Sequence, residues 1–306
     1  MKTRTLVVVV AVALMLVFPA TQGFVAECDE LVETVGTHGS INWSQGIIMA
    51  MGIGTPPEKY CGKPQLARPM ALRAAQQDAY RNLIEVTNGV RIDSTTVVKD
   101  YIVESDVVHS QVRGMVEGAR VVKKEYLSDG TVEVTLVMSL RGGFAQLILP
   151  KDIKQVSEIK TIPSAPVTPA NEERVEEASV PESAEPTITK AAPTSYTGLV
   201  VDARGLNSRP AMSPKIFDEN GQEVYGSGYV SREFAVQEGM TGYTKDLTAA
   251  QTNPRVSNEP FMVKGLRTEG PGRSDVVISN ADAARIRSAS ENLSFLKKCR
   301  VMIVSD

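Results

Sequence analysis

A helical period marks one segment near the middle of the first half of the chain. Between residues 70 and 86, apolar side chains recur at spacings of three and four, which is typical of one face of an α-helix. The members of this stripe are Leu72, Ala75, Ala79, Leu83 and Val86. Pro64 and Pro69 suit the first turn of such a helix, and Gly89 suits its C-terminal cap. Because the stripe is rich in alanine, we expect this helix to pack closely against a sheet.

Strand patterns surround the helix. Val132, Val134, Leu136 and Met138 alternate with other residues between residues 131 and 140, as in a half-buried strand. The Asp129-Gly130 pair before it predicts a hairpin turn back to a strand within residues 115–126. Residues 41–53 are expected to be mostly extended with a bulge at Gly46, residues 90–103 to favour β-structure, and residues 106–114 to form a short helix. Residues 28–150 therefore predict an α+β domain, with a helix or two on one face of a mostly antiparallel sheet.

The periodicity ends at residue 151. Six prolines are scattered among Glu, Ser, Thr and Ala between residues 151 and 195: Pro163, Pro166, Pro169, Pro181, Pro186 and Pro193. Such a stretch buries too little apolar surface to offset the entropy of ordering it, so residues 151–195 predict a disordered linker.

Ordered patterns return from residue 196 and predict a second, small α/β domain over residues 196–306. Residues 198–203 and 275–278 read as strands, and residues 215–225 as a hairpin. A helix capped by Asn280 is expected to run to about Lys298, followed by a buried strand at residues 301–304. If the two strands flanking this helix are parallel, their connection is expected to be right-handed.

The N-terminus predicts export. Lys2 and Arg4 precede an apolar run from Leu6 to Phe18, and small residues follow up to Gly23. A membrane-spanning helix needs about 20 apolar residues, so this run fits a signal peptide better than an uncleaved anchor or a buried helix. We expect residues 1–23 to be removed, leaving no transmembrane span and a periplasmic protein. Glu27, directly before Cys28, argues against a lipid anchor on Cys28, while outer-membrane association stays open.

Charge and cysteine content narrow the class further. A net charge of −3, 5% aromatic residues and the lack of a basic stripe argue against nucleic-acid binding. Cys28, Cys61 and Cys299 allow three single pairings. We favour a Cys28–Cys61 disulfide because both residues precede the long helix, and the alternative is that all three are unpaired.

Candidate chemistry is sparse. His38 and His109 have no zinc-ligand spacing, and no serine-nucleophile motif is present. Carboxylate pairs such as Glu104 with Asp106, or Asp202 with Asp218, are weak candidates for hydrolysis. The glycine-rich stretch at residues 265–273 lacks a phosphate-binding lysine and contains Pro271, so it predicts a solvent loop. We therefore predict no enzyme, no cofactor and no metal.

Asp202 and Arg204 stand out because an acid and a base two apart on an extended chain face the same side. They are candidates for contact with a charged partner, and the alternative is an ion pair with each other that orients the turn.

The segment 43–143 resembles the family of secreted envelope proteins that includes the LPP-twenty lipoproteins and the N-terminal domain of the flagellar assembly protein T. The resemblance rests on the strand at residues 41–54, an alanine-bearing helix, residues 89–92, residues 112–121 and the valine strand at residues 132–138. The helix alanines are Ala67, Ala71, Ala74, Ala75 and Ala79. It implies a non-enzymatic α+β module at the cell envelope, sometimes tied to flagella or the outer membrane. The family often has a lipid anchor, from which this chain departs at Glu27.

The leading hypothesis is an exported, non-catalytic two-domain protein that contacts envelope or flagellar basal-body proteins; its oligomeric state is not predicted. The linker would let the two domains engage separate partners. A secreted hydrolase is one alternative. A small-molecule or glycan site in the second domain is another, lined by Arg204, Tyr225, Tyr229 and Tyr243, for which the competing role is packing.

Overall fold

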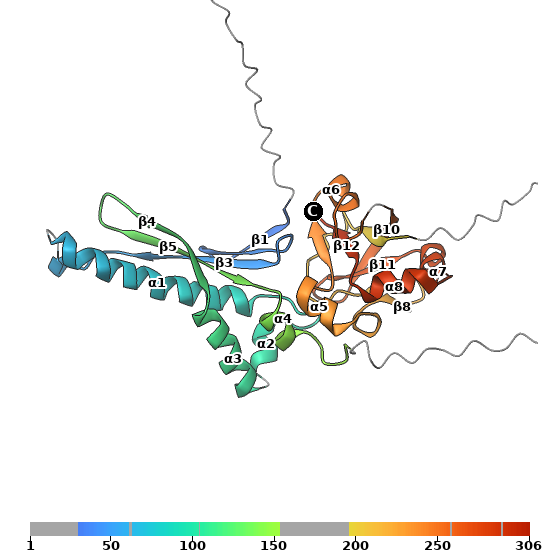
Figure 1. Ribbon diagram of the computed structural model, residues 1–306, viewed down its shortest axis with the longest axis horizontal. Coiled ribbons are helices and arrows are strands. Elements are labelled where there is room, and N and C mark those ends of the chain that lie inside the picture. The colour runs from blue at the N-terminus through green and yellow to red at the C-terminus, as the bar shows by residue number, and fades with distance from the viewer. Residues whose placement is uncertain (1–29, 61–62, 104, 154–195, 258, 289) are drawn as a thin grey trace, which may run out of the picture.

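The computed structural model describes residues 30–306 except 61–62, 104, 154–195, 258 and 289. A helix-on-sheet first part lies beside a second part built on its own sheet, as Figure 1 shows, so the predicted α+β class is confirmed. The predicted signal peptide, Cys28, Cys61 and nearly all of the predicted linker lie outside the described residues. None of the described helices is long and apolar enough to cross a membrane.

The first sheet has five antiparallel strands in the order β1-β2-β3-β5-β4. Their bounds are β1 Val32–Val35, β2 Gly39–Asn42, β3 Ile47–Gly54, β4 Arg120–Tyr126 and β5 Val132–Ser139. The four alternating apolar residues predicted for β5 all face inward and are at most 8% exposed. Gly130 has φ of +88° in the β4–β5 turn, as the Asp-Gly prediction requires.

Helix α1 (Pro64–Asn88) covers the inner face of this sheet and is longer than the pattern predicted. Its alanine stripe rests on two glycines of β3. A Cβ at Gly52 would lie 2.0 Å from the Ala79 nitrogen, and one at Gly54 would lie 2.0 Å from the Ala71 oxygen. Alanine on the helix and glycine on the strand together allow this close approach.

Side chains of α1 also close the free edge of β3. Strand β2 pairs with β3 only over residues 47–50, which leaves the far half of that edge open. There the Asp78 carboxylate accepts from the Ile53 amide at 3.0 Å, and the Asn82 amide donates to the Met51 carbonyl at 2.7 Å. The Met51 amide donates to the His38 carbonyl at 2.7 Å, so α1 and the residue before β2 together bind the main chain of this edge.

Several expectations for the first domain are wrong in detail. Residues 41–53 form parts of two strands rather than one, and Gly46 lies in the turn between them with φ of +69°. Residues 90–103 form a loop followed by α2 (Val98–Val103), not a strand. By contrast, the predicted cap at Gly89 is confirmed: Gly89 ends α1 with φ of −81°, and its amide donates to the carbonyls of Glu85 and Val86.

The remaining short helices have simple local causes. The expected helix at residues 106–114 is confirmed as α3 (Asp106–Glu117), which Ser105 caps by accepting from the Val108 amide at 3.5 Å. Helices η1 (Glu58–Tyr60) and α4 (Gly143–Ile148) were not predicted. Both are too short to give a periodic signal.

The second sheet has seven strands in the order β8-β7-β11-β10-β6-β12-β9. Strands β6 (Gly198–Asp202), β9 (Gly242–Thr244), β10 (Pro260–Glu269) and β12 (Val301–Val304) run parallel to one another. On one face, Val200 and Met302 pack under α6 (Leu247–Gln251). On the other, Leu199 and Ile303 pack with Ile286 and Leu296 from the C-terminal helices. Burial on both faces explains why β12 is wholly apolar and why β6 is apolar up to Asp202.

One edge of this sheet is the predicted hairpin, β7 (Ile216–Asp218) and β8 (Glu223–Tyr225), and β9 forms the other edge. Beyond the hairpin lie η3 (Ser227–Tyr229) and α5 (Arg232–Glu238), in a glycine-rich region whose sequence predicts no regular element.

The predicted terminal strand-helix-strand unit is present, with corrections. It consists of β11 (Asp275–Ile278), two helices, α7 (Asn280–Ser288) and α8 (Ser290–Lys297), and β12. Strand β11 is antiparallel to β10, while β12 is parallel to β6 and β6 to β10. The condition for a right-handed parallel crossover is therefore not met. The Ser279 hydroxyl, rather than Asn280, accepts from the Asp282 amide at the start of α7.

Candidate functional site: the junction between the domains

The loop between α1 and α2 joins the first domain to the second. The Met212 amide donates to the Arg91 carbonyl at 3.0 Å, and the Ser213 amide donates to the Ile92 carbonyl at 2.7 Å. A third main-chain bond runs from the Gly272 amide to the Ser94 carbonyl at 2.6 Å. We call residues 90–97 the junction loop.

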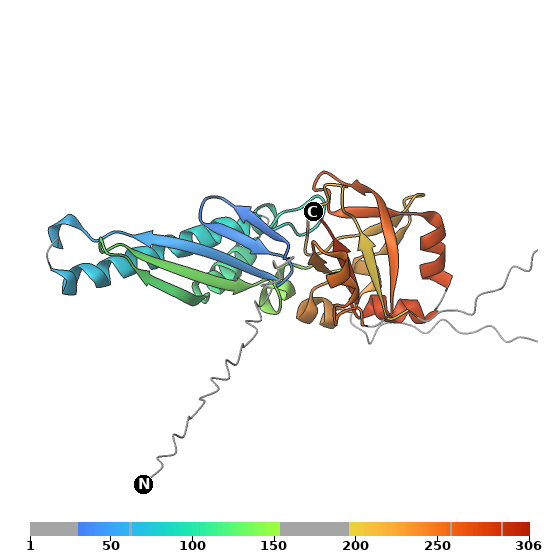
Figure 2. The same ribbon diagram turned by 90° about the horizontal axis from the view of Figure 1, so that it is seen from above.

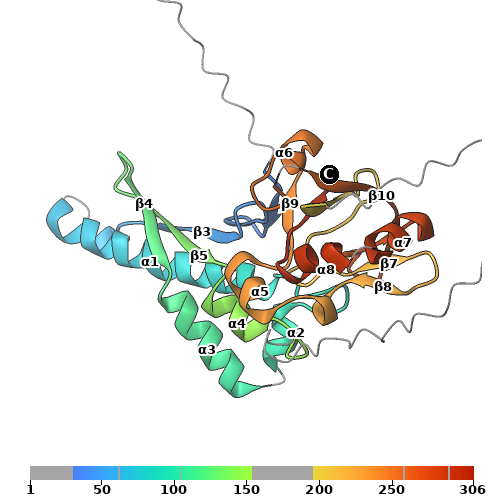
Figure 3. The ribbon, with the colours of Figure 1, turned by 45° about the vertical axis from the view of Figure 1, so that its right-hand side comes forward.

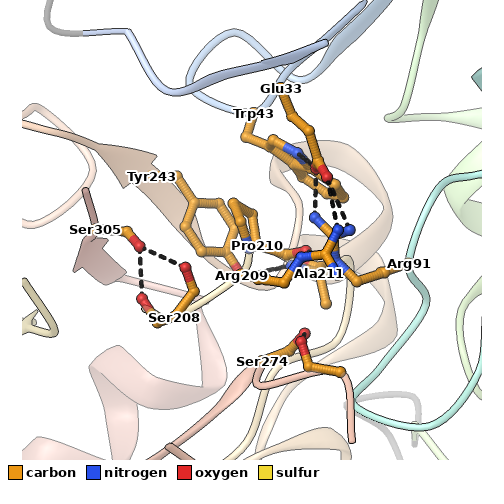
Figure 4. Close-up of polar contacts among 11 residues, drawn as sticks. Glu33, Trp43, Arg91, Ser208, Arg209, Pro210, Ala211, Tyr243, Ser274 and Ser305 are labelled. Carbon is orange, nitrogen blue, oxygen red and sulfur yellow. Dashed lines mark hydrogen bonds and ion pairs between the residues drawn. The ribbon is translucent and has the colours of Figure 1, made fainter. Parts of the chain in front are cut away.

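Arg91 is the central side chain of the junction. Its guanidinium binds both carboxylate oxygens of Glu33 on β1, and its Nε donates to the Pro210 carbonyl of the second domain at 2.7 Å. The guanidinium also lies 5.7 Å from the centre of the Trp43 ring. Figure 4 shows these groups converging between the two domains. Because the Arg91 side chain is only 7% exposed, this is a largely desolvated ion pair.

Two further side chains donate hydrogen bonds to the Glu33 carboxylate. The Trp43 indole donates to it at 3.0 Å, and Arg209 of the second domain donates to it at 3.2 Å. Burial alone would raise the pKa of Glu33, but the hydrogen bonds and charge of Arg91, with help from Trp43 and Arg209, more than offset burial and lower it. The carboxylate is therefore held in its charged form as a structural partner.

Aromatic rings fill the junction beside this ion pair. The rings of Trp43 and Tyr243 meet edge to face with centroids 6.0 Å apart. The Tyr243 hydroxyl donates to the Ala211 carbonyl at 2.9 Å and accepts from the Ala211 amide at 3.1 Å. Burial raises the pKa of Tyr243, so the phenol stays neutral. The hollow beside the rings measures about 40 Å³, enough for a water molecule but not for an organic substrate.

A second polar contact docks Ser94 into the turn between β10 and β11. Its hydroxyl donates to the Asp275 carboxylate at 2.5 Å. A Cβ at Gly272 would lie 2.7 Å from the Ser94 carbonyl oxygen, and one at Gly270 would lie 2.6 Å from the Ser94 Cβ. The sequence predicts that the glycine-rich stretch at residues 265–273 is a solvent loop. Its Gly270 and Gly272 instead pack against Ser94 of the first domain. Burial raises the pKa of Asp275 despite its bonds from Ser94 and the Lys215 amide.

Helix α4 provides a further contact on the other side of the junction, beside α5 as Figure 3 shows. The Gly142 amide donates to the Val236 carbonyl at 2.8 Å. Arg232 donates to the carbonyls of Pro150 and Gln146, each at 2.8 Å. The domains are thus joined at several points.

Asp202 and Arg204, the predicted partner-contact residues, bind each other. Two guanidinium nitrogens of Arg204 donate to the two carboxylate oxygens of Asp202, each at 2.8 Å. The Arg204 guanidinium holds the pKa of Asp202 below its usual value. Arg204 remains 42% exposed, so the pair lies at the surface and orients the turn after β6.

The other residues predicted as candidates for catalysis or ligand binding do not lie together in the structure. Asp202 ends β6 and Asp218 ends β7, and these strands run in opposite directions, so the two carboxylates lie at opposite ends of the strands. Asp218 instead binds Arg287 at 2.8 Å. Tyr225 is buried with its hydroxyl on the Met240 carbonyl, and the half-exposed Tyr229 donates to the Glu223 carbonyl. Glu104 lies outside the described residues.

Cysteine and histidine chemistry is equally limited. Cys299 is buried and forms no disulfide in the described part of the chain, and burial raises its pKa to about 11, so the thiol is protonated. The described residues contain no group of three or more side chains that could hold a metal ion. His109 lines a hollow of about 120 Å³ between α1, α2 and α3, together with Ile84, Ile102 and Val112.

The contacts of the junction cannot be predicted from local sequence. Glu33 and Arg91 are 58 positions apart, and Ser94 and Asp275 are 181 apart, so no local pattern connects them. One local signal existed: the Asp93 carboxylate accepts from the amides of Thr95 and Thr96, as aspartate does in tight loops. That signal argued against a strand at this position.

The fold and junction define a two-domain α+β protein whose domains share one polar interface. Residues 198–306 match the family described as the second domain of Treponema pallidum Tp0624. The match covers about a third of the chain, so the similarity concerns the second domain. No curated protein matches the chain.

Proposed function

We propose that this chain is an exported, non-catalytic protein of the cell envelope that acts through protein–protein contacts. The observation that carries the proposal is the junction, where polar groups of the two domains bind each other: Arg91 binds the Pro210 carbonyl, Arg209 binds Glu33, and Ser94 binds Asp275. In a catalytic cleft, such polar groups would instead face a space large enough for a substrate.

The rest of the proposal draws on the sequence. The basic start, the apolar run and the small residues up to Gly23 support export to the periplasm. The resemblance of residues 43–143 to the LPP-twenty and flagellar assembly T family supports envelope or flagellar basal-body partners. Two domains joined at several points would present their surfaces to such partners at a fixed distance, as a scaffold requires.

The test is made in cells that express the full chain. Mass spectrometry of the periplasmic fraction should find a mature N-terminus just after Gly23. A photo-crosslinking residue at Val107 or Leu266, which are 66% and 45% exposed, should form an adduct with a defined envelope protein. The same residue at the buried Ile286 is the matched control and should form none.

Retention in the cytoplasm with residues 1–23 intact would contradict the export part of the proposal. The absence of any heteromeric adduct from both exposed positions would contradict the contact part. An adduct between two copies of the chain would not support the contact part of the proposal, because the proposed partners are other envelope proteins.

A further inference from the structure

The outer face of the first sheet, which we define as the face turned away from α1, carries an apolar stripe. Ile47, Met49, Met51 and Ile53 alternate along β3 with residues that pack under α1, so all four point outward. Three are half-buried and Ile53 is 37% exposed. Figure 2 shows the strands in front of α1, with no described helix across them.

This stripe breaks the pattern of its neighbours. An antiparallel sheet with one solvated face normally alternates apolar and polar residues. Strands β2 and β5 largely follow that rule, with Ser40, Thr135 and Ser139 on the outer face and Val137 as the apolar exception on β5. Strand β3, the central strand, has no polar side chain at all. That composition is typical of a strand covered on both faces, and the described chain covers only one.

Charges beside the stripe run from basic to acidic along the strands. Opposite Val137 on β5 lies Arg120, and opposite Glu133 lies Glu125. Lys123, between these positions, binds Glu125 at 2.8 Å. Among the described residues, neither Arg120 nor Glu133 forms an ion pair, and Glu133 interacts only at longer range with Lys123, whose pKa it helps Glu125 to raise. One cation at one end and one carboxylate at the other can therefore pair with a second molecule.

We propose that two copies of this chain pair through their outer faces, about a two-fold axis that crosses the strands. Such an axis reverses the strand direction of the second copy, so β3 lies against β3 and the basic end of each face meets the acidic end of the other. A two-fold axis parallel to the strands would instead place β4 against β1, whose outer face offers only Val32 and Thr34. The charges therefore select the crossing axis.

The strand edges fit this pairing less well than the faces do. The free edge of β3 is closed by Asp78 and Asn82. The free edge of β4 carries Lys123 and Lys124, which in an edge-to-edge pair would approach the same lysines of the second copy.

The area of the outer face sets the expected affinity of the dimer. From strand spacing and rise, five short strands give an interface of roughly 1,000 Å² in total. That lies at the lower limit for specific association, so we expect a reversible dimer with a dissociation constant of the order of micromolar.

Sedimentation equilibrium of the purified protein tests the proposal over concentrations from about 1 to about 200 µM. The expected result is a monomer–dimer equilibrium that Met51→Lys weakens by about tenfold or more, because it buries a charge at the centre of the pair. Val107→Lys adds the same charge to an exposed valine of α3 and should leave the dissociation constant unchanged. A wild-type protein that stays monomeric, or a Met51→Lys variant that pairs as well as the wild type, overturns the proposal.

Charge reversal tests the direction of the axis with variants that stay on the solvent face. Arg120→Glu and Glu133→Arg should each weaken pairing several-fold, and the double variant, which restores opposite charges between copies, should recover most of the loss. A double variant no tighter than the weaker single variant overturns the crossing axis. Because only purified protein is used, failure here leaves the proposed envelope function standing.

Discussion

Arg91 shows how a single residue can couple two domains. Its guanidinium ties β1 to the end of α1 through Glu33, and to the second domain through the Pro210 carbonyl. The carbonyl of the same residue accepts from the Met212 amide. Removing this side chain would leave Glu33 partly buried with fewer donors, and breaking a buried pair in this way costs up to about 3–5 kcal/mol.

Glu33 gives the junction a pH dependence with a definite sign. Its pKa is lowered in the folded protein, so the ion pair stabilises the fold above the ordinary value of 4.5 and is lost as the pH falls through the lower folded value. We expect Glu33→Gln to lower the free energy of unfolding by about 1–3 kcal/mol at neutral pH. Urea unfolding at neutral pH and again at about pH 3 should show the deficit shrinking in acid.

Glu117→Gln is the control for this prediction. Glu117 pairs with Arg113 on α3, but its side chain is 63% exposed, and such pairs contribute little. The variant should match the wild type at both pH values. A Glu33→Gln deficit of equal size at both pH values would contradict the assigned role of the carboxylate.

Among elements, the contact between α1 and β3 is the most tightly constrained in the first domain. Gly52 and Gly54 lie beneath the main chain of α1, and the contacting atoms, Ala75 O, Ala79 N and Ala71 O, are backbone atoms that cannot rotate away. Any side chain at these positions must push the helix off the sheet. Packing would then weaken along the whole buried alanine stripe of α1.

We therefore expect Gly52→Ala to destabilise the protein by about 1–3 kcal/mol or more, because overpacking against rigid backbone forces α1 to shift. Thermal unfolding followed by circular dichroism provides the measurement. Gly114→Ala on α3 is the matched control, since a Cβ there meets nothing within 4 Å. It should instead stabilise the protein by about 0.5–1 kcal/mol through helix propensity. Equal effects of the two substitutions would rule out the close approach.

The elements that the sequence predicts well are those with a repeated signal. The alanine stripe of α1, the alternation of β5 and the Asp-Gly turn each depend on neighbours in sequence, and each is confirmed. The sequence of the junction loop predicts β-structure because Thr95, Thr96 and Val97 favour strands, whereas its actual partners, such as Met212, lie far along the chain. Strands as short as β9 give too few residues for any period.

The candidate site was less predictable than the fold. Asp202 and Arg204 are close in sequence, and one of the two interpretations offered for them, a mutual ion pair, is what the structure contains. Glu33 carried no local signal, because its three donors, Trp43, Arg91 and Arg209, come from separate segments. Tertiary contacts of this kind are not encoded in local spacing.

At the scale of the whole molecule, the junction makes one body of two domains. The first sheet and α1 extend to one side of it and the second sheet lies on the other, as Figures 1 and 2 show. The C-terminus also lies near it, where the Ser305 hydroxyl donates to the Ser208 carbonyl at 2.9 Å. A rigid body of this kind would hold the outer face of the first sheet at a fixed position relative to the second domain.

The central claim is that the junction joins the two domains into one cooperative unit, and differential scanning calorimetry of the wild-type protein tests it most directly. We expect a single transition whose calorimetric and van't Hoff enthalpies agree. Arg91→Ala should lower its midpoint by several degrees and broaden or split it, because the variant removes bonds to both domains. Two separate transitions in the wild type, or an unchanged single transition in Arg91→Ala, would contradict the claim.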